Sequence, residues 1–395
     1  MKMDSICNSV NRFNLDYEFD LFDFHKDNQK EKNKISQMAK EFEYVYFFIE
    51  KSKSTLRNLR PYPDDYLDYL KTIGLMVPQF TDNSKVIMNN WWGSLKNKKL
   101  EKELNSKETS TQFALKYDYC HPATGIVKSK EEFFNHLEKH PYLQWVSRSA
   151  YSSGGYGIFK FKKDDLFLNK YFENKIEKFL LKGPMVLEPK LERILDIGIT
   201  LDLENELNYF FTQNFVSDLG SFKGGLVFSN SDLLSTVFSN NQEIMDSYEI
   251  FLKKLKSYYI DKGAIGTIQV DSFLYKENKK IKCYPLVEVN YRKTMGLVLK
   301  NFESFLPEKG IGGWYLFNRK EFVSLKSFEE LLKKINKNIY NNSTRCGIIP
   351  TSPVNYKFPS LFISAKNKKD LFDYLSFVQK TLLNKNSNLP KEFLY

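Results

Sequence analysis

The residues best suited to chemistry lie on two strand-like segments that flank a polar turn at 276–280. Residues two apart on a strand point to the same face, so Glu288 and Asn290 project together, and Asp271 lies on the partner strand. Carboxylate and amide oxygens suit Mg²⁺, which makes these three side chains candidate metal ligands, and Arg292 follows where its guanidinium could meet a phosphate. Spacing alone is equally consistent with Asp271 and Glu288 being exposed residues of an ordinary antiparallel hairpin.

A second candidate is the serine- and glycine-rich segment 152–157, which joins two apolar, strand-like stretches. Its glycines let backbone N–H groups approach an anion, its serines add hydroxyl donors, and Arg148 places a positive charge beside it. The segment is not a GxGxxG motif that opens a helix, which disfavours a Rossmann dinucleotide site. A plain hairpin turn is the alternative.

Other catalytic constellations are missing from the sequence. The histidines form neither an HExxH motif nor a triad, so a surface or capping role is expected for each, and no serine has the GxSxG context of a nucleophile. The histidines are His25, His121, His136 and His140. The four cysteines lie far apart without a CxxC pair, which predicts neither a zinc site nor a disulfide framework and fits a reducing compartment.

The composition is that of a folded protein with more than one core, since 42% of the 395 residues are hydrophobic and 16% are aromatic. The net charge of +11 arises from scattered lysine pairs rather than a basic stripe, so nucleic-acid binding is not expected. The chain shows no signal peptide and no apolar run of membrane-spanning length. A soluble, cytoplasmic protein is predicted.

Apolar periodicity predicts the elements that position these residues. Residues 13–105 mix short apolar runs, at 44–49 and 75–77, with charged helix-like stretches, which is typical of an α/β layer. Further along the chain the pattern predicts helices at 129–139, 164–181, 242–259 and 327–339, and strands at 143–146, 158–161, 185–187, 197–203, 207–211, 265–275, 281–290 and 361–365.

Taken in order, these features resemble the ATP-grasp superfamily of carboxylate ligases. The similarity is closest to uncharacterised bacterial ATP-grasp proteins with a loop like K-x-P-x-S-S-S-G-R-G and a strand like E-I-N-x-R-x-x-M-G. The corresponding segments here are 148–157, Arg-Ser-Ala-Tyr-Ser-Ser-Gly-Gly-Tyr-Gly, and 288–296, Glu-Val-Asn-Tyr-Arg-Lys-Thr-Met-Gly. Two positions depart from the pattern: Arg148 stands for a lysine, which keeps the charge but not its point-like geometry, and Tyr156 stands for a basic residue.

The resemblance implies an α+β ATP-grasp fold, in which two α+β lobes with antiparallel sheets follow an α/β pre-ATP-grasp domain. The implied boundaries are 1–105 for the pre-ATP-grasp domain, 106–185 for the small lobe, 186–310 for the large lobe with the metal site, and 311–395 for a C-terminal extension packed on the core.

The resemblance also implies a role for each matching residue. Lys107 and Arg148 would contact the phosphates of ATP, and Asp196 would contact the ribose. Asp271, Glu288 and Asn290 would hold one or two Mg²⁺ ions. Arg292, together with Arg148, would face the transferred phosphate or the substrate carboxylate. The loop over the phosphates would use Ser152, Ser153, Gly154, Gly155 and Gly157, and the strand that holds adenine would be Met185, Val186, Leu187 and Glu188.

The function that the resemblance implies is ligation of a carboxylate to an amine, with ATP forming an acyl phosphate intermediate. The substrates would be small-molecule or peptide carboxylates and amines, with identities that the sequence does not reveal, and the oligomeric state stays open. One alternative is a degenerate ATP-binding protein that regulates a partner or serves as a scaffold, favoured by Arg148. Another is phosphoryl transfer without ligation, which would need the same metal site.

Overall fold

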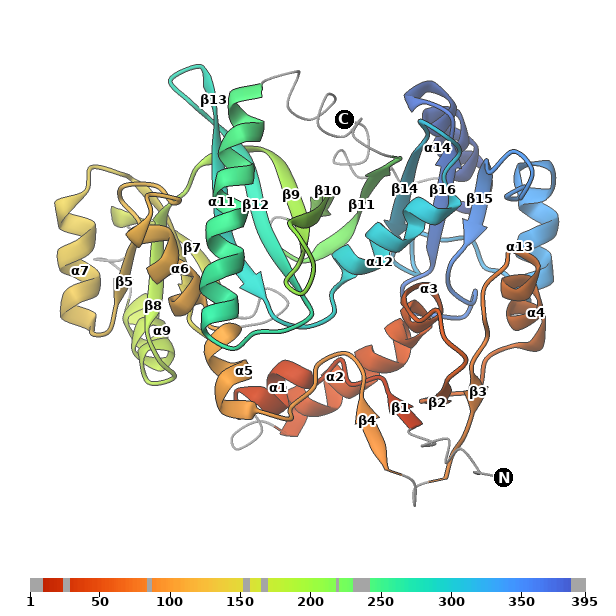
Figure 1. Ribbon diagram of the computed structural model, residues 1–395, viewed down its shortest axis with the longest axis horizontal. Helices are drawn as coiled ribbons and strands as arrows, with labels where there is room; N and C mark the ends of the chain where they lie inside the picture. The colour runs from red at the N-terminus through yellow and green to blue at the C-terminus, as the bar shows by residue number, and fades with distance from the viewer. Residues whose placement is uncertain are drawn as a thin grey trace. The chain divides into compact units, whose positions relative to one another are not determined.

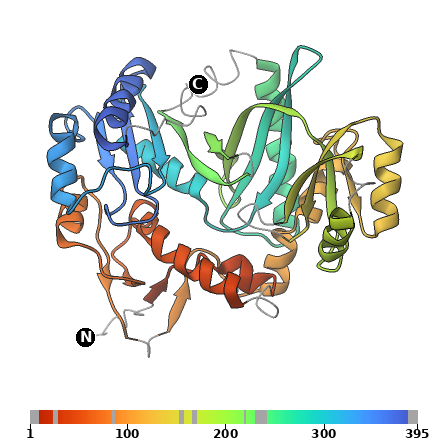
Figure 2. The same ribbon diagram turned by 180° about the vertical axis from the view of Figure 1, so that it is seen from behind.

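The computed structural model describes residues 10–23, 29–83, 87–151, 157–164, 170–217, 220–229 and 242–384, and the chain divides into two compact units. Unit 1 comprises Met1–Lys96, Gly224–Asp232 and Lys293–Tyr395, and unit 2 comprises Asn97–Lys223 and Leu233–Arg292. The elements are shown from two sides in Figure 1 and Figure 2. No helix in these described ranges combines the length and apolar character that crossing a bilayer requires.

The first part of unit 1 is the predicted α/β layer. Its parallel sheet has the order β3-β2-β1-β4, and the strands are β1 (Val10–Arg12), β2 (Thr55–Arg57), β3 (Gln79–Phe80) and β4 (Met88–Asn90). Parallel neighbours need crossover connections. The helices along these connections are α1 (Tyr17–Leu21), α2 (Gln29–Phe42), α3 (Tyr46–Ile49) and α4 (Asp64–Thr72). The apolar runs 44–49 and 75–77 add no strand to the sheet, because the first is helical and the second is a loop.

The second part of unit 1 holds antiparallel strands. β14 (Ile311–Leu316) pairs with β16 (Ser360–Ala365) and with the Gly224–Phe228 part of β11 (Phe222–Phe228), and β15 (Gly347–Pro350) pairs with β16. Every residue of β14, β15 and β16 is buried. The helices here are α12 (Met295–Phe302), α13 (Phe328–Ile335) and α14 (Lys368–Leu382). The predicted helix at 327–339 and strand at 361–365 are thereby confirmed, although α13 ends earlier than predicted.

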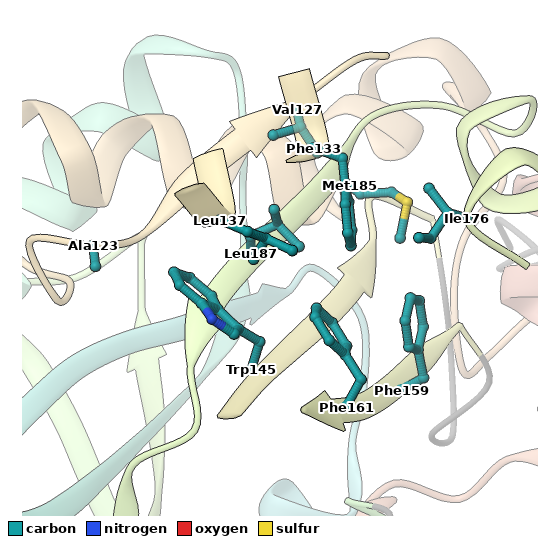
Figure 3. Packing of buried hydrophobic residues seen from close by; sticks show 10 residues of the cluster. All are labelled: Ala123, Val127, Phe133, Leu137, Trp145, Phe159, Phe161, Ile176, Met185 and Leu187. Carbon is teal, nitrogen blue, oxygen red and sulfur yellow. The ribbon is translucent and has the colours of Figure 1, made fainter. Parts of the chain in front are cut away.

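The smaller sheet of unit 2 has the order β5-β8-β6-β7 and is antiparallel throughout. Its strands are β5 (Gly125–Val127), β6 (Gln144–Ser149), β7 (Ile158–Lys162) and β8 (Met185–Pro189). Helices α7 (Lys130–Lys139) and α9 (Lys170–Leu180) pack on one face through an apolar cluster, shown in Figure 3. The cluster comprises Ala123, Val127, Phe133, Leu137, Trp145, Phe159, Phe161, Ile176, Met185 and Leu187.

The larger sheet of unit 2 contains β9 (Glu192–Asp202), β10 (Asn208–Val216), β12 (Thr267–Glu277) and β13 (Lys280–Asn290) in the antiparallel order β13-β12-β9-β10. The long helix α11 (Gln242–Asp261) lies along one face, as Figure 1 shows. Apolar residues such as Ile199 and Val270 are buried, whereas their neighbours Thr200 and Asp271 are polar. The predicted meander and hairpin are therefore confirmed, and alternate positions give the sheet one polar face.

Candidate functional site

The three predicted metal ligands lie together on the polar face of the hairpin. The strand register places Asp271 of β12 directly opposite Glu288 of β13, and Gln269 opposite Asn290. The Nδ2 atom of Asn290 donates a hydrogen bond of 3.3 Å to Oδ2 of Asp271. The hairpin therefore gathers two carboxylates and one amide within one small area.

Two buried cations approach the same carboxylate. Lys107 is the first residue of α6 (Lys107–Lys116), whose preceding Ser106 caps it by accepting from the Glu108 N–H. Its Nζ lies 2.5 Å from Oε2 of Glu288, and Nη1 of Arg148 lies 3.9 Å from the same oxygen. The side chains of Lys107 and Arg148 are only 7% and 4% exposed, so solvent screens these interactions weakly.

The pKa values of the two carboxyl groups, Asp271 and Glu288, shift in opposite directions. Burial and the charge of Glu288 raise the pKa of Asp271, and the positive charges of Arg292 and Lys107 oppose this only in part. Burial also works to raise the pKa of Glu288, but the charges of Lys107 and Arg148 outweigh it and lower that pKa. The site therefore holds Glu288 as the ionised member and leaves Asp271 as the one with the higher proton affinity.

Arg148 joins the small sheet to the hairpin. Its Nη2 lies 2.8 Å from Oε1 of Glu188 on β8, and its Nη1 donates a hydrogen bond of 2.8 Å to the carbonyl of Val287. The hydroxyl of Tyr284 also donates to Oε1 of Glu188 and lies 3.2 Å from the hydroxyl of Thr124. The sequence assigned no role to Tyr284, although it shares the alternating hairpin pattern with Glu288.

The predicted adenine strand is β8. Its Met185 and Leu187 side chains belong to the apolar cluster, whereas Val186 pairs with Arg148 in the register. Backbone pairing is two-sided at Met185–Leu187, because β5 and β6 flank the strand there. At Glu188 only β6 pairs with it. From Glu188 onward, the side of β8 that β5 covers at Met185–Leu187 has no strand paired with it. A ligand could therefore form hydrogen bonds with the backbone of β8 on that side only from Glu188 onward.

Asp196 lies on β9, where the register pairs it with Phe273 of β12. Arg193 forms an ion pair with it at 2.8 Å, and the same guanidinium lies 4.1 Å from the centre of the Phe273 ring. Burial raises the pKa of Asp196, and Arg193 opposes the shift. Because the charge of Asp196 also raises the pKa of Asp271, the two carboxyls share one electrostatic environment.

Solved structures with a similar fold span nearly the whole chain. The biotin carboxylase domain of 2-oxoglutarate carboxylase from Hydrogenobacter thermophilus, solved with MgADP, ADP and bicarbonate, covers 95% of this chain and 90% of its own, with a TM-score of 0.53 and 11% identity. N5-carboxyaminoimidazole synthetase from Staphylococcus aureus covers 95% of this chain and 97% of its own, with a TM-score of 0.50 and 10% identity. This chain has the ATP-grasp fold.

The ATP-grasp fold that the sequence predicted is thereby confirmed, with its antiparallel sheets after an α/β domain. No protein-family model and no curated protein matches the sequence. Identity near 11% supports the fold and leaves the substrates open. The domain boundaries at 105, 185 and 310 and the residue roles stay predictions.

Part of the predicted ATP-grasp phosphate loop lies outside the described residues. Ser152, Ser153, Gly154 and Gly155 are in this group. Gly157 is described and has a φ of +84°, a conformation that glycine adopts without strain. Its carbonyl accepts a hydrogen bond of 2.9 Å from the N–H of Ser149, which joins the ends of β6 and β7.

Within the described ranges, no cluster of three or more His, Cys, Asp or Glu side chains is placed to hold a metal. The predicted trio has two carboxylates, and its third donor is the amide of Asn290. Two carboxylates suffice for Mg²⁺, which usually keeps water and shares its shell with phosphate oxygens. The donor set therefore fits Mg²⁺ bound with a nucleotide better than a metal held by protein alone.

A pocket of about 320 Å³ lies away from the predicted residues, between the small sheet and the tip of the hairpin. Its polar lining residues are His121, His140, Tyr142, Tyr275, Glu277 and Lys282. His121 is buried, so the predicted surface role is wrong for it, and its Nδ1 accepts a hydrogen bond of 3.1 Å from the Ala123 N–H within a local turn. Its Nε2 lies 3.5 Å from Glu277, which Lys282 already pairs at 2.5 Å.

Proposed function

We propose that this chain binds ATP with Mg²⁺ in unit 2 and joins a carboxylate to an amine. The γ-phosphoryl group of ATP would pass to a carboxylate oxygen, giving ADP and an acyl phosphate. The amine nitrogen would then attack the acyl carbon, and phosphate would leave as the amide forms. The observation that supports this best is the convergence of Lys107 and Arg148 on Glu288, beside Asp271 and Asn290.

Asp271, Glu288 and Asn290 would hold the metal. The raised pKa of Asp271 is consistent with this assignment, because burial and the neighbouring charge of Glu288 both disfavour its ionised form, and a divalent cation would offset both. When bound, Mg²⁺ would neutralise charge on the phosphates. The solved biotin carboxylase domain of similar fold contains MgADP, which supports the same choice of ligand here.

Lys107 and Arg148 would hold the phosphates, with the loop at 152–157 over them. In the structure both cations are paired with carboxylates, which keeps this buried area near neutrality. Lys107 would exchange Glu288 for a phosphate oxygen as the carboxylate turns to the metal. Arg292 would orient the transferred phosphate or the substrate carboxylate. Positioning and electrostatics supply the catalysis in this scheme, which needs no protein nucleophile.

The second candidate is a catalytically degenerate ATP-binding protein that regulates a partner or serves as a scaffold. The observation in its favour is the set of bonds that Arg148 makes to Glu188 and to the Val287 carbonyl. A guanidinium held by both groups is fixed in orientation, so it is less free to turn toward a phosphate than the flexible ammonium of a lysine at that position. In this case the chain would bind nucleotide without releasing ADP.

The first test is thermal stabilisation by ATP with Mg²⁺, because a ligand that binds only the folded state raises its stability. We expect a raised melting temperature for the native chain and a reduced shift for Glu288→Ala and Asn290→Ala. Glu192→Ala, which removes an exposed carboxylate from β9, serves as the matched control and should keep the full shift. If the folded native chain shows no shift at millimolar nucleotide, the ATP-binding proposal fails.

A second assay separates the catalytic options. ADP release that needs both a carboxylate and an amine supports ligation, and release that needs no amine indicates phosphoryl transfer alone. Binding of MgATP without ADP release across a broad set of carboxylates and amines would instead favour the regulatory or scaffold protein.

A further inference from the structure

The pocket at the tip of the hairpin has a lining of mixed chemistry. Its volume is about 320 Å³, and residues 121–123 and 140–142 enclose it together with Tyr275, Glu277 and Lys282. All of these residues belong to unit 2. Pockets for small molecules span about 300 to 1,000 Å³, so this one has room for a small metabolite.

The lining holds one carboxylate and one ammonium. Nζ of Lys282 on β13 lies 2.5 Å from Oε2 of Glu277 on β12, and both side chains remain partly exposed. Glu277 would repel a simple anion in this pocket, and Lys282 would repel a simple cation. A molecule that carries both an ammonium and a carboxylate would instead find an opposite charge for each of its own.

His121 fixes the buried side of Glu277. Its side chain is 5% exposed, and its Nδ1 accepts from the Ala123 N–H, so Nε2 carries the proton of the neutral ring. Nε2 lies 3.5 Å from Oε1 of Glu277 and 3.2 Å from the hydroxyl of Tyr142. The hydrogen bond from Lys282 lowers the pKa of Glu277, so this carboxylate stays ionised between the two neighbours.

The rest of the wall is largely apolar. Aliphatic carbons come from Pro122, Ala123 and Pro141, and rings come from Tyr142 and the buried Tyr275. The rings of Tyr142 and His121 meet edge to face, with their centres 5.2 Å apart. A hydrocarbon side chain would gain free energy from leaving water for such a wall.

The pocket is separate from the proposed metal site. Glu277 lies six residues beyond Asp271 on β12, a distance of about 20 Å along an extended strand. Reacting atoms must approach to about 3 Å, so an amine held by Glu277 cannot attack a group at the metal. Among the described residues, none that the sequence assigned to ATP or Mg²⁺ lines this pocket.

We propose that this pocket binds a free α-amino acid with an uncharged, apolar side chain, whose ammonium contacts Glu277 and whose carboxylate contacts Lys282. The lining combines loops of the small sheet with the hairpin of the larger sheet, so the bound amino acid would hold these parts of unit 2 together as an effector. The inference does not rest on the proposed nucleotide function.

The test is isothermal titration of the full chain with L-leucine and L-phenylalanine, each compared with two analogues that lack one charge. Isocaproate and hydrocinnamate lack the ammonium, and isoamylamine and phenethylamine lack the carboxylate. We expect at least one amino acid to bind, and its two analogues to bind at least about tenfold more weakly. No binding of either amino acid at about 10 mM, or an analogue that binds as tightly as its parent, would overturn the proposal.

Glu277→Gln and Lys282→Gln test the two contacts separately. Glu277→Gln should weaken binding of the amino acid at least about tenfold, and its affinity should then approach that of the carboxylate analogue, since the ammonium has lost its partner. Lys282→Gln should produce the same approach toward the amine analogue. If either variant weakened the amino acid and both analogues equally, the assignment of the two contacts would be wrong.

Glu249→Gln is the matched control, because it removes the carboxylate of an exposed ion pair, 2.6 Å from Lys253 on α11. It should leave the affinity for the amino acid unchanged. Exposed ion pairs add little stability, so all three variants should melt close to the native chain. The shift with MgATP should survive in Glu277→Gln, which separates this site from the nucleotide site.

Discussion

The two faces of β6 and β8 use alternate residues of the same strands for opposite purposes. On one face Trp145, Met185 and Leu187 pack into the apolar cluster of the small sheet (Figure 3). On the other face Arg148 and Glu188 form a buried ion pair. Both faces are removed from solvent, yet only the first gains stability from that burial.

The difference teaches how a short strand can serve both packing and chemistry. The apolar face gains from dispersion and from area removed from water, so its stability depends on volume. The stability of the polar face depends on both charged partners being present, because removal of one leaves the other buried without a compensating charge. Substitutions at the neighbouring positions Leu187 and Glu188 separate the two effects.

The largest effect is expected on the apolar face. Leu187→Ala should lower the free energy of unfolding by about 4 kcal/mol, because it removes a fully buried side chain and leaves a cavity. Leu187→Met, which nearly conserves volume, should cost less than about 1.5 kcal/mol. Urea denaturation measures both. Equal losses for the two variants would show that volume does not control this face.

On the polar face, Glu188→Ala should lower the free energy of unfolding by about 3 kcal/mol, because Arg148 then loses its nearest carboxylate. The loss falls at the lower end of the usual range, since the Val287 carbonyl and Glu288 still contact the guanidinium. Denaturation of Glu188→Ala and of the native chain under the same conditions measures it.

The double variant Arg148→Met with Glu188→Leu sharpens this result. It replaces both charges with apolar groups, so it should be more stable than Glu188→Ala alone. It should also abolish stabilisation by MgATP if Arg148 contacts phosphate. A double variant that is less stable than Glu188→Ala would contradict the idea that the uncompensated charge of Arg148 causes the loss in the single variant.

The hairpin that carries Asp271 and Glu288 could be predicted from the sequence, because its strands are long enough for alternation to reveal the polar face. The strands of the α/β layer could not be located, because β1 to β4 have at most three residues each, too few to show a period. Instead the apolar run 44–49 stood out, and it is helical.

Several residues of the predicted site lie together in the structure, while their roles stay predictions and the contacts that hold them were not predicted. The motif order brought Lys107, Arg148 and Glu288 together, and the structure places them within one set of ion pairs. The ion pair of Arg148 with Glu188 joins residues 40 positions apart in sequence, and the hydroxyl of Tyr284 comes from another sheet. Such contacts depend on how sheets pack, which local patterns do not encode.

The smallest effect is a pH dependence that comes from Asp271 on the polar face of the hairpin. Its pKa is raised by burial and by Glu288, so the folded state holds this proton more tightly than the unfolded state. Stability is therefore lost as pH rises above about 4, the ordinary pKa of aspartate, toward the raised value. Asp271→Asn removes that loss, so its stability relative to the native chain should grow with pH over this window. One group changes the free energy of unfolding by at most about 1.4 kcal/mol per pH unit.

Melting curves at several pH values measure this pH dependence. The control is Glu192→Gln on β9, which removes an exposed carboxylate, and its stability relative to the native chain should stay constant with pH. A constant difference for Asp271→Asn as well would show that Asp271 does not carry the crowded charge that a metal would relieve.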